Sequence, residues 1–155
     1  MTRLAGPALF LLTFGLYLWT AYPSMSSYRD CGELATGAVT LGIAAAPGYP
    51  LYMSAGHMFL DLVPFGSTVY RLHVLSVFCG ALAVWGVWRL LSGLVPAPAA
   101  LAAAGFLAVS TSIWKLSQMT EMYALNAVVF VALLSVAGGA WSARRRLAAG
   151  AMLVG

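Results

Sequence analysis

The sequence predicts an all-α, polytopic transmembrane protein, and two observations carry that prediction. Hydrophobic residues make up 62% of the 155 positions and charged residues only 8%, whereas soluble domains carry about 25% charged residues. The apolar residues also fall into long runs, separated by stretches rich in proline, glycine or charge. Both features argue against a soluble fold and indicate helices that cross a lipid bilayer.

Four apolar runs come close to the length of about 20 residues that a helix needs to cross a bilayer. These predicted spans cover residues 5–22, 72–94, 97–113 and 123–141, and the Pro96-Ala97-Pro98 segment separates the second from the third. A cleaved signal peptide is the alternative for the first run. The span is favoured, because no small-x-small cleavage site follows the run and Pro23 interrupts the region.

The end of the sequence predicts a further helix. After Arg144–Arg146 the chain becomes apolar again from residue 147, but too few residues follow to cross a bilayer about 30 Å thick. We therefore expect a truncated fifth span, and we interpret residues 1–155 as the N-terminal fragment of a longer membrane domain.

The charge distribution predicts the orientation. The net charge of +4 comes from eight basic and four acidic residues, and the basic ones form no stripe of the kind that binds nucleic acid. A cytoplasmic N-terminus gives the cytoplasmic side five of the eight, as the positive-inside rule expects: Arg3, Arg89 and Arg144–Arg146. The loop at residues 23–71 is then extracytoplasmic, and the membrane is expected to be the bacterial inner membrane. All four acids fall on that same outer side: Asp30, Glu33, Asp61 and Glu121.

The loop at residues 23–71 is too apolar to be a solvated connector, and its pattern predicts two interfacial helices, at about 31–46 and 51–63. Each has one polar stripe. The first stripe is Glu33, Thr36 and Thr40; the second is Ser54, His57 and Asp61, with Leu51, Ala55, Met58, Phe59 and Leu62 opposite. The segment Pro47-Gly48-Tyr49-Pro50 separates the two helices.

Asp30 and Glu33, at the start of the first of these helices, permit two interpretations that are not exclusive. Their spacing fits an acidic capping box, in which Asp30 accepts from first-turn amides and Glu33 reaches back. A carboxylate at the membrane interface can also serve as a general base.

Neither the cysteines nor the histidines predict a metal site. Cys31 lies in the loop and Cys79 inside an apolar run, so a disulfide between them is not expected, and metal-type spacing is absent. His57 and His73 each stand alone on a mainly apolar segment, which favours a structural role over a ligand or base. No cofactor is predicted with certainty, and a divalent metal is left open.

Several motifs resemble those of the protein O-mannosyltransferase-like family, multi-pass membrane proteins within the GT-C glycosyltransferases. One is Tyr28-Arg29-Asp30-Cys31-Gly32-Glu33-Leu34, and another is Pro47-Gly48-Tyr49-Pro50-Leu51-Tyr52. A third, Gln118 to Leu125, is similar to the family's acid-x-Tyr-x-Leu segment. The resemblance extends over nearly the whole chain, as the N-terminal part of such a protein with a GT-C-like fold.

The resemblance implies a membrane glycosyltransferase that moves a sugar, with mannose as a candidate, from a polyprenyl-phosphate carrier to a protein or glycan acceptor on the extracytoplasmic side. The motif match gives the catalytic role to Asp30, with Glu33 next, and the isolated fragment is expected to be inactive. A carboxylate would take the acceptor's proton, and cations would stabilise the departing phosphate. Arg71 is the preferred cation, with Arg29 and Lys115 also available. The substrate-binding candidates are Arg71, Glu121, Tyr123, Tyr49 and Arg29.

Two alternatives stay open. Where the family commonly has His-Pro, this chain has Ala45-Ala46, which is compatible with a catalytically degenerate or non-enzymatic membrane protein of the same fold. A transporter is disfavoured, because ionisable residues near mid-membrane are expected in transporters and the predicted spans show no convincing example.

Overall fold

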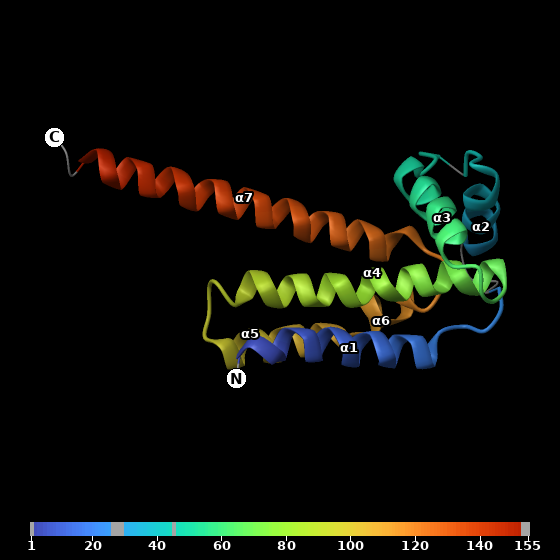
Figure 1. Ribbon diagram of the computed structural model, residues 1–155, viewed down its shortest axis with the longest axis horizontal. Coiled ribbons are helices and arrows are strands. Elements are labelled where there is room, and N and C mark those ends of the chain that lie inside the picture. Colours follow the sequence, from blue (N-terminus) through green and yellow to red (C-terminus); the bar gives the residue numbers. More distant parts are fainter. Residues whose placement is uncertain (1, 26–29, 45, 153–155) are drawn as a thin grey trace.

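The computed structural model describes residues 2–25, 30–44 and 46–152, and within them the chain forms seven α-helices and no strand (Figure 1). Side chains are described for the same ranges between residues 4 and 139. The helices are α1 (Thr2–Thr20), α2 (Cys31–Thr40), α3 (Pro50–Leu62), α4 (Thr68–Leu91), α5 (Ala97–Ala108), α6 (Thr111–Ser117) and α7 (Met122–Met152).

α4 is the centre of the structure and packs against α1, α3, α5, α6 and α7. Figure 1 shows α1, α4 and α5 running side by side, with α7 leaving α4 at an angle. One end of the structure, which we call the loop end, contains α2 and α3. At this end α1 stops and α4 and α7 start. The opposite end, where α4 stops and α5 starts, is the far end.

The helices support a membrane protein, with some changes to the predicted spans. Two helices are long and apolar enough to cross a bilayer, Thr68–Leu91 and Met122–Gly139, and the apolar helix Leu4–Thr20 is shorter. The third predicted span is not one helix over 97–113: α5 and α6 meet at a bend of 57° and together can form one broken span. By length and composition the described residues therefore contain two candidate spans, or three if α5 and α6 form one, and the count of four stays a prediction.

Two other helix boundaries differ from the prediction. α2 stops at Thr40, because Leu41 adopts a left-handed conformation and its N–H caps the helix by bonding to the Gly37 carbonyl. α7 continues through Arg144–Arg146 to Met152, so the described residues show no separate helix starting at residue 147. A run of arginines has high helix propensity and does not by itself end a helix.

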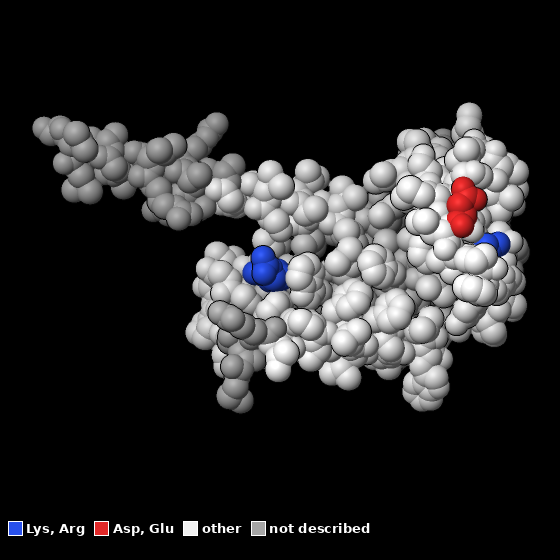
Figure 2. Space-filling view, in the orientation of Figure 1, with Lys and Arg blue, Asp and Glu red and all other residues white. Residues whose placement is uncertain are grey.

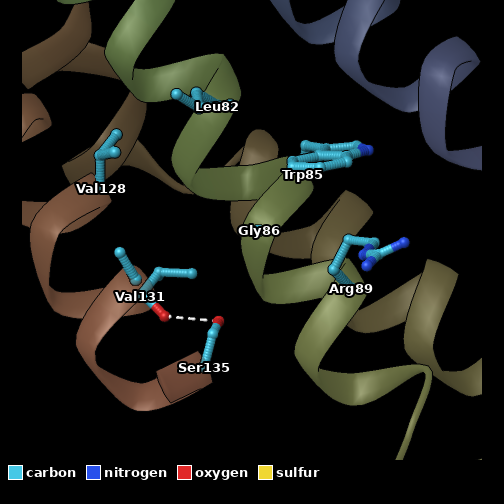
Figure 3. Close-up of a pocket in the computed structure, with 8 residues that line it drawn as sticks. Leu82, Trp85, Gly86, Arg89, Val128, Val131 and Ser135 are labelled. Atoms are coloured by element: carbon cyan, nitrogen blue, oxygen red, sulfur yellow. Dashed lines mark hydrogen bonds between the residues drawn. The ribbon is translucent and has the colours of Figure 1, made fainter. Parts of the chain in front are cut away.

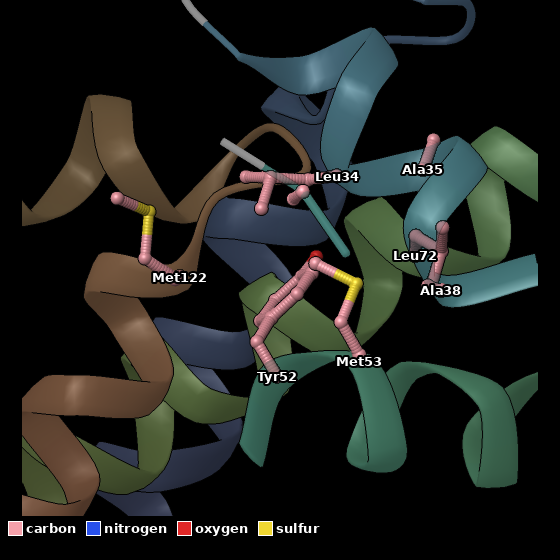
Figure 4. Packing of buried hydrophobic residues seen from close by; sticks show 8 residues of the cluster. Leu34, Ala35, Ala38, Tyr52, Met53, Leu72 and Met122 are labelled. Carbon is pink, nitrogen blue, oxygen red and sulfur yellow. The ribbon is translucent and has the colours of Figure 1, made fainter. Parts of the chain in front are cut away.

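α2 and α3 pack on the start of α4 and α7 through a buried hydrophobic cluster, shown in Figure 4. Its main members are Leu34, Ala35, Ala38, Tyr52, Met53, Leu72 and Met122. Gly56 allows close packing, since a Cβ there would lie 2.9 Å from the Ala38 Cβ. The half-buried His57 ties the two helices together, because its Nδ1–H donates to the Ala38 carbonyl at 2.9 Å.

The predicted polar stripes are mostly exposed on both helices, whereas the apolar face predicted for α3 is not the face that packs on protein. The α2 stripe of Glu33, Thr36 and Thr40 is exposed. On α3, however, the buried residues are Tyr52, Met53 and Gly56, while three members of the predicted apolar face are exposed: Leu51, Met58 and Leu62. In a membrane protein an apolar side chain can face lipid, so hydrophobicity does not reveal which side of a helix packs on protein.

The bend between α5 and α6 is held against α1 by two hydrogen bonds. The Tyr17 hydroxyl donates to the Ala108 carbonyl at 2.7 Å, where α5 ends. The Trp114 indole Nε1–H of α6 donates to the Thr20 hydroxyl at 2.9 Å. Both bonds satisfy polar groups in an apolar environment, which explains how the helix break is tolerated there.

Candidate active site at the loop end

The four carboxylates all belong to elements at the loop end, as the sequence predicts. Asp30 precedes α2, Glu33 lies in its first turn, Asp61 lies near the end of α3, and Glu121 comes directly before α7. Figure 2 shows exposed acidic atoms at this end of the molecule, over the region of α2 and α3. The order of the helices along the chain thus brings the four acids to one end of the structure.

Asp30 and Glu33 are exposed side chains at the start of α2. Asp30 occupies the N-cap position, but its side chain makes no capping hydrogen bond, since its backbone angles are φ −91° and ψ 16° rather than extended. Only its carbonyl takes part, accepting from the Leu34 N–H at 2.8 Å. The Asp30 half of the predicted capping box is therefore wrong, and the carboxylate is not used to begin the helix.

Glu121 differs from these two acids because it is fully buried, with 0% of its surface exposed. The Ser76 hydroxyl of α4 bridges its backbone, accepting from the Glu121 N–H and donating to its carbonyl at 3.4 Å each. Its carboxylate therefore lies inside the helix bundle at the loop end. The sequence-based topology placed Glu121 on the outer side but did not predict this burial.

His73 connects three segments at the same place. It is fully buried on α4, its Nε2 lies 3.2 Å from the Ser24 carbonyl, and its Nδ1 lies 2.7 Å from the Thr120 hydroxyl. A carbonyl only accepts, so Nε2 carries the proton and Nδ1 accepts from Thr120 in the neutral ring. His73 thus fixes the chain after α1 and the residue before Glu121, which confirms the structural role predicted for it.

The candidate tyrosines occupy different environments. Tyr49 is half-buried, at φ 43° directly before α3, and packs against the buried cluster. Tyr123 is 39% exposed at the start of α7. Tyr52 is buried, and this burial raises the pKa of its hydroxyl above the ordinary value, with the Glu121 carboxylate adding to the rise. The three tyrosines therefore range from buried to exposed.

The basic candidates also differ in their surroundings. The Arg71 Nη1 donates to the Leu60 and Val63 carbonyls at 2.9 and 2.8 Å, where α3 ends, and Nη2 lies 3.4 Å from the Thr68 hydroxyl. Arg71 thus uses its Nη1 to cap the end of α3. Arg29 lies outside the described residues. Lys115 is exposed on α6.

The described residues contain no group of three His, Cys, Asp or Glu side chains that would hold a metal ion. Cys31 and Cys79 are both buried and unpaired thiols, as expected.

Sequence reasoning missed Ser76 and Thr120 as parts of this site. A signal for Ser76 was present: His73 and Ser76 are separated by three positions in a predicted span, so both lie on one face of the helix. Two polar side chains on one face of an apolar helix predict a polar partner segment. Thr120 gave no such signal, because its partner His73 lies 47 positions away in the chain.

Taken together, the apolar helices and the loop end indicate a multi-pass membrane protein whose four carboxylates belong to elements at one end. Residues 30–154 match the family described as "Protein O-mannosyl-transferase TMEM260 N-terminal domain". The chain therefore belongs to this O-mannosyltransferase family and represents its N-terminal part, which confirms the resemblance.

Two curated relatives agree with the family. The chain is 39% identical over 109 residues to "Protein O-mannosyl-transferase TMEM260" of Mus musculus, an alignment that covers 68% of this chain and 15% of the mouse protein. It is 30% identical over 142 residues to "Protein O-mannosyl-transferase tmem260" of Dictyostelium discoideum, covering 90% of this chain and 17% of that protein. The chain thus spans less than a fifth of the length of these relatives.

No solved structure matches the chain. The GT-C fold implied by the resemblance therefore stays a prediction, while the described residues show an all-α fold with two to three candidate spans. Both relatives come from eukaryotes and lend no support to the predicted bacterial inner membrane.

Proposed function

We propose that this chain is the N-terminal part of a membrane glycosyltransferase that transfers a sugar, with mannose as the candidate, from a polyprenyl-phosphate carrier to a protein or glycan hydroxyl. The names of the relatives support the transferase and the mannose. The apolar helices support a donor that is itself held in the membrane. The acceptor side would be extracytoplasmic, with the N-terminus of the chain in the cytoplasm; a bacterial inner membrane stays a prediction.

The observation that carries this proposal is the exposure of the Asp30 carboxylate, which makes no capping bond. An N-cap aspartate normally uses its side chain to satisfy first-turn amides, yet the Asp30 carboxylate is exposed and makes no capping bond. Glu33 is exposed one turn further along α2. Two accessible carboxylates at the start of one helix can both reach an acceptor bound over the loop end.

In the proposed reaction Asp30 acts as the general base. It takes the proton of the acceptor hydroxyl while the hydroxyl oxygen forms a bond to the anomeric carbon of the sugar. The bond between that carbon and the phosphate oxygen breaks, and the electron pair leaves with the polyprenyl phosphate. Glu33 is proposed to orient the acceptor, and Glu121 with Tyr123 and Tyr49 to shape the sugar subsite.

The proposal predicts that Asp30→Asn lowers sugar transfer by about 100-fold or more, the usual contribution of a general base. The full-length protein would be expressed in membranes and given radiolabelled polyprenyl-phosphate mannose and an acceptor peptide. Glu33→Gln is expected to raise the KM for the acceptor more than it lowers kcat.

Asp61→Asn is the matched control, because Asp61 is an exposed acid of the same end on α3. It should transfer sugar like the wild type. Full activity of both Asp30→Asn and Glu33→Gln would contradict the catalytic assignment. A wild-type protein without any transfer, although correctly inserted, would favour the non-enzymatic alternative.

A further inference from the structure

The bend between α5 and α6 opens a pocket of about 310 Å³ in the side of the helix bundle. Five residues line it: Val109, Thr111, Trp114, Lys115 and Gln118. A hydroxyl, an amide and an ammonium group therefore meet in one hollow of a broken apolar helix. In membrane proteins, irregular backbone is tolerated where it is buried in protein or lines a cavity, and broken helices commonly form binding sites.

The pocket lies toward the loop end, on the side of the bundle formed by α1. Trp114 bonds to Thr20, the last residue of α1, and Ala108 bonds to Tyr17 one turn before. The Gln118 carbonyl also accepts from the Tyr22 N–H at 3.1 Å, just after α1 ends. The Trp114 ring and the Gln118 backbone are thus fixed at the level where α1 leaves the apolar region.

Lys115 is the charged group of this pocket, and it is exposed. At the end of an apolar span a lysine can extend its ammonium group to the membrane interface, where the anionic groups of lipids lie. Arg71 contrasts with it, because the Arg71 Nη1 already donates to the Leu60 and Val63 carbonyls and the side chain is half-buried. Lys115 can therefore offer its ammonium group to an external anion.

An apolar strip leads from the pocket along α5. Phe106 and Val109 are separated by three positions on one helix face and are 77% and 55% exposed. Val109 also lines the pocket, so the strip and the pocket are continuous. A ligand with an anionic group at Lys115 and an apolar chain along Phe106 matches this arrangement, whereas a soluble anion would leave the strip uncovered.

We propose that the α5–α6 pocket binds the phosphate of the polyprenyl-phosphate carrier, with Lys115 pairing with the phosphate and the first isoprene units lying on Val109 and Phe106. This inference rests on the proposed function for the identity of the lipid. It assigns the phosphate to Lys115 rather than to Arg71, the cation preferred on sequence grounds.

The test measures lipid retention by the purified full-length protein in phosphatidylcholine nanodiscs that contain traces of polyprenyl phosphate, polyprenol or phosphatidylglycerol. Native mass spectrometry would read the bound lipid. Wild type should retain polyprenyl phosphate, and Lys115→Ala should lower this retention by about tenfold, the usual cost of one charge-assisted contact. Lys115→Arg should restore it. Thr111→Glu, which places a negative charge in the pocket and keeps the lysine, should also lower retention.

Arg89→Ala is the control, since Arg89 is an exposed cation of the far end, and it should leave retention unchanged. Weak binding of polyprenol that does not depend on Lys115 would support the phosphate as the recognised group. Equal retention of polyprenyl phosphate by wild type and Lys115→Ala would overturn the inference, and preferential retention of phosphatidylglycerol would overturn the choice of lipid.

The outcome is distinguishable from a failure of the proposed function. If wild type transfers sugar and Lys115→Ala leaves the donor KM unchanged, the transferase stands and the pocket assignment falls. If wild type retains the lipid through Lys115 but transfers nothing, the pocket assignment stands and the catalytic proposal falls.

Discussion

At the loop end, polar side chains tie α4 to its neighbours, whereas at the far end α4 meets α7 mainly through apolar side chains. His73 and Ser76 bond to the Thr120-Glu121 segment and to Ser24. Six positions after Ser76, Leu82 begins the lining of an open groove of about 300 Å³ between α4 and α7. One helix thus has a polar, hydrogen-bonded half and an apolar, loosely covered half.

Figure 3 shows the far-end groove, with Trp85 and Arg89 projecting from α4 and Val128 and Val131 from α7. The Arg89 guanidinium lies 5.7 Å from the Trp85 ring centre. Hydrogen bonds thus fix the geometry of the end where the acids lie. The rest of α4 is held by nondirectional packing, which tolerates small displacements better.

The largest expected difference in stability between the two ends comes from the hydrogen bonds of the loop end. His73→Ala removes a fully buried ring and leaves the Thr120 hydroxyl and Ser24 carbonyl without their partner, at a cost of about 3 kcal/mol. Ser135→Ala at the far end removes an exposed hydroxyl that bonds only within α7, so its cost is below about 0.5 kcal/mol. Unfolding midpoints of the full-length protein in detergent would compare the two variants. Equal shifts would contradict the claim that the His73 hydrogen bonds stabilise the loop end.

A second pair tests the close contacts. At Gly80 an added Cβ would press on Ser117, lying 2.7 Å from its Cβ and 3.2 Å from a Tyr17 ring carbon. At Gly86 it would lie 2.6 Å from the Val131 Cγ1. Gly80→Ala should destabilise by about 2 kcal/mol through overpacking. Gly86→Ala should cost less, because Val131 borders the open groove and can move into it. The same unfolding experiment measures both variants, and a larger loss of stability for Gly86→Ala than for Gly80→Ala would contradict this explanation.

The smallest expected difference concerns the two arginines. Arg71→Met removes two hydrogen bonds to the end of α3 and should cost about 1.5 kcal/mol. Arg89→Met removes one cation–π contact of an exposed side chain and should cost about 0.5 kcal/mol. Limited proteolysis provides the measurement, since only Arg71→Met should speed cleavage between α3 and α4. Equal cleavage of the two variants would show that Arg71 does not hold this end of α3.

Much of this architecture was predictable because membrane helices have simple requirements. Length and apolarity predicted α4 and the first part of α7, and Pro50 with the preceding Pro-Gly-Tyr segment predicted the start of α3 almost to the residue. The gathering of the four acids at one end also followed from counting spans and locating arginines.

Other features were not predictable from local pattern. The break after Ala108 contains no proline or glycine, and its only local signal is the run Ser110-Thr111-Ser112, which favours helix ends over helix interiors. The buried face of α3 depends on where α2 lies, and the burial of Glu121 depends on Ser76 across the bundle. These are tertiary effects, and lipid removes the usual link between hydrophobicity and the protein interior.

The most direct test of the account is which side of the membrane the loop end faces. Single cysteines would be placed at two exposed positions of the full-length protein, Asp61→Cys on α3 at the loop end and Arg89→Cys on α4 at the far end. The native Cys31 and Cys79 are buried and should give little background. We predict that a membrane-impermeant maleimide added outside labels position 61 in intact cells and position 89 only after permeabilisation; the opposite pattern would contradict an extracytoplasmic site at the loop end.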